Sequence, residues 1–304
     1  MRNKLNKKDK KLINLRFILF FLAKYLEDKI LFSIFAQNLK DTVRKIYILL
    51  IVAMVACVGC ELHLKPNDAN NEDDKISLHR YDRIQSLYLT TGDFSALQQM
   101  NLVYPQQTRT LIEDVLKLGR VNDPDINNKF LNFYQDTVLQ ALVNEVEQQY
   151  ANVDDINEEL QHSFDKLLQK LPALTAPMVY TQIGALDQSI VVGNNAVGIS
   201  LDKYLGTDYP LYLKYYPLSQ RKLMTRSMIV PDCMLFYILS AYPIPDDGKS
   251  QLTADLHIGK IQWIVNRMVG RRVFNTRYTA FVAKYMKKHS GMSFDQLLSV
   301  ERLP

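Results

Sequence analysis

An apolar run from Ile46 to Cys60, preceded by Arg44 and Lys45, limits which part of this chain can fold as a globular domain. Cations, a short apolar segment and then small residues form the layout of an export signal. As a helix the run would cover about 21 Å, less than the roughly 30 Å of a bilayer's hydrocarbon core. We therefore predict that residues 1–59 are an N-terminal extension with a signal peptide, and that the domain follows them.

Cys60 stands at the cleavage point of this signal, which resembles the lipobox of bacterial lipoproteins. In a lipobox the signal is removed and the cysteine sulfur receives diacylglycerol. The position three residues earlier holds Cys57 instead of the usual leucine. We predict lipidation at Cys60, and the alternative is a short membrane-anchor helix without lipid.

The first 42 residues hold two apolar pieces, Leu15–Ala23 and Ile30–Ala36, with charges between them. Neither piece is long enough to span a bilayer. They could form an amphipathic segment on a membrane surface. Our preferred hypothesis is a later start, at Val43 through a GTG codon, so that residues 1–42 are not translated.

The charge of the chain is unevenly distributed. The net charge of +5 suggests an acidic partner, but residues 1–59 hold twelve Lys and Arg against four Asp and Glu. The other residues hold 25 against 28. The basic excess therefore belongs to the part predicted to be removed, and a nucleic-acid partner loses its support.

The residues that follow the signal indicate a flexible connection and a chain without disulfides. Residues 60–75 are polar and lack apolar periodicity, which predicts a tether between lipid and domain. Its acidic cluster, Glu72 to Asp74, is not adjacent to the lipidated cysteine, which favours a periplasm-facing position over the cell surface. Only Cys233 then remains as a thiol, and its apolar neighbours predict that it is buried and inert.

From Ile76 onward the apolar residues recur mostly with helical spacing. The predicted helices are Tyr81–Tyr88, Leu111–Leu118, Phe130–Tyr150, Asp154–Leu171, a helix from Pro231, Leu252–Val269, Tyr278–Met286 and a short helix after Ser293. Ser293 and Gln296 have the spacing of a capping box.

A short β-rich region interrupts the helices. Met178–Ile183, Ser189–Val192 and Ala196–Leu201 are the predicted strands, and Asn194-Asn195 is a hairpin turn signal. We expect about three strands in one small antiparallel sheet. Residues 76–304 are thus predicted to form a single, mainly helical α+β domain.

The motifs of common exported hydrolases are missing from the sequence. No two of the five histidines are four residues apart, so the helical zinc-peptidase motif is absent. Ser200 lacks the second glycine of a nucleophile elbow, and there is no Gly-rich phosphate loop. We predict no metal site, no cofactor and no catalytic residue.

Acidic and phenolic side chains gather where the last strand ends. Asp202, Tyr204 and Asp208 follow that strand, and Asp232 follows Pro231. They could form an acidic pocket or a Ca²⁺ site. The simpler interpretation is that Asp202 and Asp208 cap turns, while Asp232 is a first-turn acid favoured by the helix dipole. We name these four residues the candidate acidic groove.

Several segments resemble the gliding-motility lipoprotein B (GldB) family of Gram-negative outer-membrane lipoproteins. They are His79-Arg-Tyr-Asp82, Leu97–Pro105, Leu167–Pro177, Val197–Gly206, Met228–Asp232, Gly259-Lys-Ile-Gln, Val282–Lys288 and Ser293–Leu298. The resemblance covers roughly residues 76 to 300. Between Gly270 and Asn275 the family normally inserts several dozen residues, so this chain resembles a trimmed member.

The resemblance also implies a distant kinship to zincin-type metallopeptidases. Their metal-binding helix would fall near Ile229–Leu235, where Pro231, Asp232 and Leu235 replace the required His, Glu and His. This kinship would make the domain a degenerate, zinc-free peptidase scaffold.

Together these features predict a lipid-anchored outer-membrane protein that acts without catalysis. Its expected partners are the membrane, through Cys60, and other envelope proteins, which would bind the candidate acidic groove as an interaction or scaffold component. One alternative is an exported hydrolase whose acidic residues act as general acid and base. Another is a solute-binding lipoprotein, which would require a deep cleft.

Overall fold

The computed structural model describes residues 76–193, 195–244 and 250–300, which belong to one compact unit. The predicted signal, the lipidation site Cys60 and the tether lie outside the described residues.

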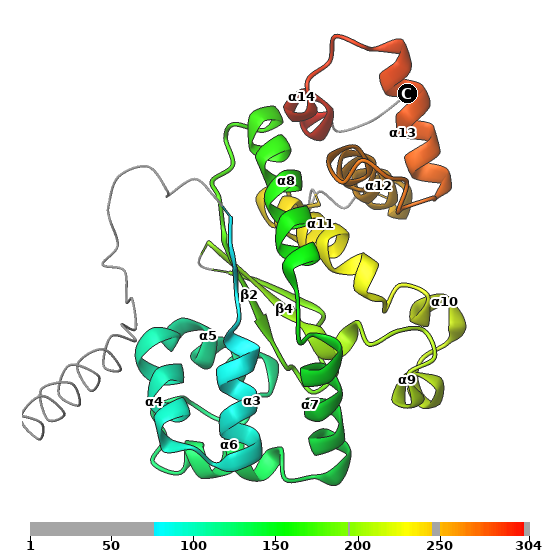
Figure 1. The fold of residues 1–304 in the computed structure, drawn as a ribbon. Helices are drawn as coiled ribbons and strands as arrows, with labels where there is room; N and C mark the ends of the chain where they lie inside the picture. The colour runs from blue at the N-terminus through cyan, green and yellow to red at the C-terminus, as the bar shows by residue number, and fades with distance from the viewer. Residues whose placement is uncertain (1–75, 194, 245–249, 301–304) are drawn as a thin grey trace, which may run out of the picture. The chain divides into compact units, whose positions relative to one another are not determined.

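Helices form most of the described chain (Figure 1). Their bounds in chain order are α3 Tyr81–Thr91, α4 Phe94–Val103, α5 Pro105–Arg109, α6 Ile126–Phe133, α7 Thr137–Gln149, α8 Asp154–Lys170, α9 Pro210–Tyr215, α10 Leu218–Arg221, α11 Ile229–Ala241, α12 Gln251–Met268, α13 Arg277–Lys288 and α14 Phe294–Ser299. A π-helix, η2, covers Thr110–Val115, and two 3-10 turns are η3 Leu201–Lys203 and η4 Arg226–Met228.

Local sequence signals account for several of these helix boundaries. The capping box before α14 is confirmed, since Ser293 Oγ accepts from Gln296 N (3.1 Å) and Gln296 Oε1 accepts from Ser293 N (2.9 Å). Pro231 is the third residue of α11 instead of the first. It is tolerated there because the first-turn amides have no intrahelical acceptor.

The predicted long helix from Phe130 to Tyr150 is wrong, because the chain forms two helices there, α6 and α7. Asp136 begins the second helix by accepting hydrogen bonds from Val138 N (2.8 Å) and Leu139 N (3.2 Å). An aspartate in this capping position stabilises a helix start by about 1 kcal/mol.

The α+β class is confirmed, but the sheet differs from the predicted one. It has four strands in the order β1-β2-β4-β3: β1 Leu78–His79, β2 Met178–Gln182, β3 Ile190–Gly193 and β4 Ala196–Ser200. Only β3 and β4 form the predicted antiparallel hairpin, while β1 pairs with β2, and β2 with β4, in parallel. Two-residue β1 is too short to show an alternating pattern.

The loop after β2 explains why the sheet is mixed. Residues 183–189 carry the chain past the position of β4, so that β3 lies at the sheet edge and the hairpin returns β4 between β2 and β3. Ala185 and Leu186 in this loop have φ of 52° and 64°. Such left-handed backbone is costly for residues with a side chain, so other contacts must hold the loop.

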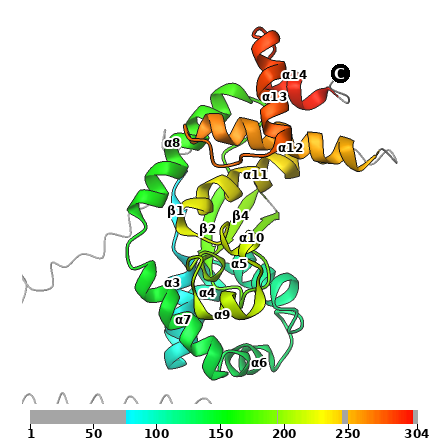
Figure 2. The ribbon, with the colours of Figure 1, turned by 90° about the vertical axis from the view of Figure 1, so that its right-hand side faces the viewer.

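The helices surround the two ends of the parallel strands. Helices α3, α6 and α7 gather near the carboxyl ends, where β1 continues directly into α3 (Figure 1). Helices α11 to α14 lie toward the opposite end, and α8 extends between the two groups (Figure 2). Cys233 on α11 is fully buried, as predicted.

Candidate functional site

Asp202, the first residue of the candidate acidic groove, lies inside the protein at the carboxyl end of β4. Its side chain is fully buried, and it accepts hydrogen bonds from Gly184 N (2.7 Å) and Leu186 N (2.6 Å). Burial raises the pKa of the Asp202 carboxyl, and these two amides oppose that rise. Asp202 therefore anchors the 183–189 loop whose backbone is strained.

Tyr204 and Asp232 form a direct pair. The Tyr204 hydroxyl donates to Asp232 Oδ2 (3.0 Å), and the Tyr150 hydroxyl donates to the carbonyl oxygen of Tyr204 (2.6 Å). Burial raises the pKa of Asp232 to about 7, while the hydrogen bond from Tyr204 lowers it. Burial and the neighbouring Asp232 also raise the pKa of Tyr204 well above its usual value. Asp232 is thus a carboxyl group that titrates near neutrality.

Asp208 stands apart from these residues. Its side chain is 91% exposed and its Oδ1 lies 3.8 Å from Arg221 Nη1. The structure therefore joins Tyr204 to Asp232, turns Asp202 toward the 183–189 loop and leaves Asp208 in solvent.

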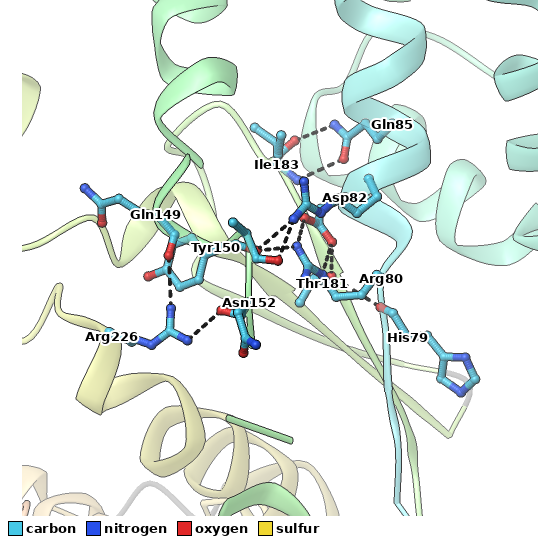
Figure 3. A network of polar contacts seen from close by, with 12 residues as sticks. His79, Arg80, Asp82, Gln85, Gln149, Tyr150, Asn152, Thr181, Ile183 and Arg226 are labelled. Atoms are coloured by element: carbon cyan, nitrogen blue, oxygen red, sulfur yellow. Dashed lines mark hydrogen bonds and ion pairs between the residues drawn. The ribbon is translucent and has the colours of Figure 1, made fainter. Parts of the chain in front are cut away.

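Sequence reasoning missed a buried polar network around Asp82, which Figure 3 shows. Asp82 is 2% exposed and forms a bidentate ion pair with Arg80, through Nε to Oδ1 (2.9 Å) and Nη2 to Oδ2 (2.7 Å). The Thr181 hydroxyl donates to Asp82, and Arg80 Nη2 donates to the carbonyl oxygen of Tyr150 (2.9 Å). These contacts connect α3 with β2 and the end of α7.

Gln85 holds the end of β2 from the same helix (Figure 3). Its Nε2 donates to the carbonyl oxygen of Ile183 (2.8 Å), and its Oε1 accepts from Ile183 N (2.9 Å). The Tyr134 hydroxyl donates to the same carbonyl (2.7 Å). No sequence pattern indicated that Gln85 is buried, because a glutamine on a helix is usually a surface residue.

Arg226 forms a second cluster, beside the turn between α7 and α8 (Figure 3). It donates to the carbonyl oxygens of Gln149 (3.2 Å) and Asn152 (2.9 Å) and pairs with Asp155 (2.5 Å). The Arg226 bond lowers the pKa of Asp155. Cations suit the carbonyl end of a helix, so Arg226 stabilises the end of α7.

An open hollow lies on the other side of the sheet, between α5 with η2 and the strands β2, β4 and β3. We call it the β3 groove; it measures about 550 Å³, and its polar wall includes Gln107, Thr110 and Asp114. Tyr180 on β2 faces it and is 3% exposed. Burial, and then the charge of Asp114, raise the pKa of Tyr180 to about 12.

A second hollow, of about 540 Å³, lies between α12 and α13 and is basic. Arg267, Arg271 and Arg272 stand around it, with Trp263 in its wall. Arg271 is fixed by a hydrogen bond to the carbonyl oxygen of Ser227 (2.7 Å) and an ion pair with Glu159. The described domain therefore has a local basic region that its net charge conceals.

Comparison with known protein families identifies the family to which the chain belongs. The family model described as gliding motility protein GldB matches residues 64–274, which is more than half of the 304-residue chain. The chain belongs to the GldB family. No curated protein and no solved structure matches it.

The GldB match confirms the resemblance seen in the sequence and places the chain among gliding-motility-associated lipoproteins. The match ends at Phe274, and α13 and α14 follow it. The trimmed insert between Gly270 and Asn275 stays a prediction. The GldB-like motif His79-Arg-Tyr-Asp82 now has a structural role, because it supplies Arg80 and Asp82 to the buried network.

The zincin kinship of the GldB family stays a prediction, since no solved structure matches the chain. The described part of α11 carries Pro231, Asp232 and Leu235 as the sequence indicated. Across residues 76–193, 195–244 and 250–300, no three His, Cys, Asp or Glu side chains are grouped as metal ligands would be. No helix within those residues combines the length and apolar character needed to cross a bilayer.

Proposed function

We propose that this GldB-family chain is a lipid-anchored protein of the outer membrane that binds another envelope protein and does not catalyse a reaction. The observation that carries the non-catalytic role is the position of Asp202. Its carboxylate is fully buried and engaged by two backbone amides. A catalytic acid must reach its substrate, and Asp202 could do so only if the 183–189 loop moved away.

The proposed anchor is Cys60, with the signal removed before it. The fifteen residues 61–75 then connect the lipid to the described domain. A segment of this length can span at most roughly 50 Å between the lipid and the domain. Each buried CH₂ of the acyl chains contributes about 0.8 kcal/mol, and several chains hold a protein stably. A periplasm-facing position is the favoured orientation.

Labelling with radioactive palmitate tests the anchor. The wild-type chain should incorporate label and fractionate with the outer membrane, whereas Cys60→Ala should do neither. The matched control is Cys57→Ala, which removes the other cysteine of the signal region and should still be labelled. Incorporation that survives in Cys60→Ala would refute lipidation at that residue.

Capture of the protein from detergent-solubilised envelopes tests the binding role. We expect a stoichiometric protein partner that is retained through gel filtration and lost after mild denaturation of the GldB-like chain. Recovery of the chain alone, with or without a bound small molecule, would contradict the role; a small molecule would favour the solute-binding alternative.

One observation favours an exported hydrolase as the second candidate. The pKa of Asp232 is raised to about 7, and values near the working pH are typical of general acids. This candidate predicts that Asp232→Asn abolishes hydrolysis of a model peptide or ester by the purified chain. Absence of any turnover above the Asp232→Asn background would remove it.

A further inference from the structure

Strand β3 forms one edge of the sheet, with β4 on its inner side. The bond from Ser200 N to Ser189 O (2.9 Å) fixes the phase of the antiparallel ladder. Hydrogen-bonded and non-bonded pairs alternate along such a ladder, so Ile190 and Val192 direct their N–H and C=O groups away from β4. Among the described residues, none forms a hydrogen bond to these outward groups.

This edge also lacks the features that usually prevent strand addition. Natural edge strands are protected by charged residues, proline or a covering element. The segment from Ser189 to Asn195 contains no charge and no proline, and Val191 and Val192 are only half-buried. Helix α11 contacts β3 and β4, but no described residue pairs with the outward backbone groups of β3. An apolar edge with free hydrogen-bonding groups is suited to another strand.

The β3 groove adjoins this edge and provides places for side chains. Val191 and Gly193 of β3 share a sheet face with Ala196 of β4, and all three line the groove. The small residues Gly193 and Ala196 leave room above the sheet. An added strand would direct alternate side chains into this space, because successive side chains point to opposite faces.

Tyr180 and Asp114 contribute polar groups to the groove. The Tyr180 ring covers Gly198, and its hydroxyl lies at the groove surface, since it is not among the fully buried polar atoms that lack a partner. Asp114, supplied by the π-helix η2, is exposed on the facing wall. No Lys or Arg lines the groove, so its formal charge is negative. π-Helical turns occur frequently at functional sites.

We propose that the β3 edge and its groove bind an extended segment of a partner protein, which pairs with Ile190 and Val192 as an added strand and places a basic side chain between Asp114 and Tyr180. The backbone pairing gives affinity, and the groove selects the side chain. This inference rests on the proposed binding function and specifies its site and the chemistry of its partner.

An array of extended hexapeptides, with Lys, Glu or Thr placed at each position among Val and Thr residues, tests the proposal with the full-length processed protein in detergent. We expect Lys-containing peptides to bind best. Val192→Pro should weaken their binding at least tenfold, because proline removes the N–H that faces the open edge. The β4 pairing does not use that N–H, so the variant should fold. Val192→Thr keeps the N–H and is the matched control.

Charge reversal at Asp114 tests whether the β3 groove selects a basic side chain. Asp114→Lys should transfer preference from Lys to Glu peptides, whereas Asp208→Lys, at another exposed aspartate, should not. Circular dichroism and thermal melting confirm that each variant folds. The proposal is overturned if no peptide binds the folded wild type, or if binding is unchanged in both Val192→Pro and Asp114→Lys.

Envelope capture with Val192→Pro separates this inference from the proposed function. Loss of the partner in this variant, but not in Val192→Thr, supports both. A partner that remains bound to Val192→Pro overturns the β3 site and leaves the binding function standing. A wild-type chain without a partner contradicts the binding function itself.

Discussion

At the scale of single residues, the interior of this domain uses charged and amide side chains to hold backbone. Asp202 fixes the loop after β2, Gln85 fixes Ile183, and Asp82 joins α3 to Thr181. A buried polar group is costly unless its hydrogen bonds are formed, so each of these residues depends on its partners. Their substitution should therefore affect stability more than any surface change.

The Asp202→Asn variant should lose stability. The amide offers one acceptor in place of two carboxylate oxygens, and its NH₂ group would face the N–H of Gly184 or Leu186. We expect the free energy of unfolding to fall by about 2–4 kcal/mol in urea titrations. Asp208→Asn, on a side chain that is 91% exposed, should stay within about 0.5 kcal/mol. Equal effects in the two variants would contradict the anchoring role.

Asp232 should make stability depend on pH. Its pKa of about 7 in the folded protein lies above the usual value of 3.8, so the folded state binds the proton more tightly between these two pH values. This contribution is fully present below pH 4 and is lost as pH rises through 7. Asp232→Asn cannot titrate and still accepts the Tyr204 bond. The free energy of unfolding of the variant, relative to that of wild type, should therefore rise by on the order of 3 kcal/mol from pH 5 to pH 8. Parallel pH profiles of the two proteins would exclude this titration.

At the scale of elements, two glycines set how closely neighbouring elements approach. A Cβ at Gly198 would lie 2.6 Å from the Tyr180 ring, so the glycine lets Tyr180 lie across β4 beside the β3 groove. A Cβ at Gly259 would lie 2.6 Å from Tyr278 Cβ and 3.2 Å from its carbonyl carbon. The α12–α13 contact therefore requires glycine at position 259.

Gly259→Ala should destabilise the protein although alanine is the better helix former. The propensity gain is about 1 kcal/mol, but separating α13 from α12 costs more, and we expect a net loss of about 1–3 kcal/mol. Gly291→Ala, where a Cβ meets nothing within 4 Å, is the matched control and should be nearly neutral. Thermal melting of both variants provides the comparison; a stabilised Gly259→Ala would show that the helices do not touch as described.

At the scale of the whole molecule, charge is divided along the chain. Residues 76–244 hold thirteen Lys and Arg against eighteen Asp and Glu, while residues 251–300 hold eight against two. The basic excess surrounds the hollow between α12 and α13. The summed charge of these residues hides the separation, since the two parts nearly cancel.

The number of reactive thiols tests the processing of the whole chain. Cys233 is fully buried, and burial raises the pKa of its thiol, which suppresses the reactive thiolate. The mature lipidated protein should show no reactive thiol when folded and one per chain in denaturant, measured with a chromogenic disulfide reagent. A precursor that is neither lipidated nor cleaved should show further thiols from Cys57 and Cys60. Two or more thiols in the denatured mature protein would count against processing at Cys60.

Much of this protein follows from its sequence alone. Helical periodicity located α3, α8 and α11 to α14, the Ser293 capping box marked the start of α14, and family motifs indicated GldB membership, which the family comparison confirmed. These features are local, because a helix or a cap is decided by residues within a few positions of one another. The predicted lipid anchor at Cys60 likewise rests on a local sequence pattern.

The tertiary structure alone decided the sheet order and the fate of the acidic residues. Strand β4 lies between β2 and β3 because the 183–189 loop, with its left-handed backbone, carries β3 to the edge of the sheet. The spacing of apolar residues does not predict this strand order. Asp202 and Asp208 look alike in the sequence, yet one is fully buried against two amides and the other is in solvent. Burial and pairing depend on residues far along the chain, as the contacts of Gln85 with Ile183 illustrate, and only folding brings those residues together.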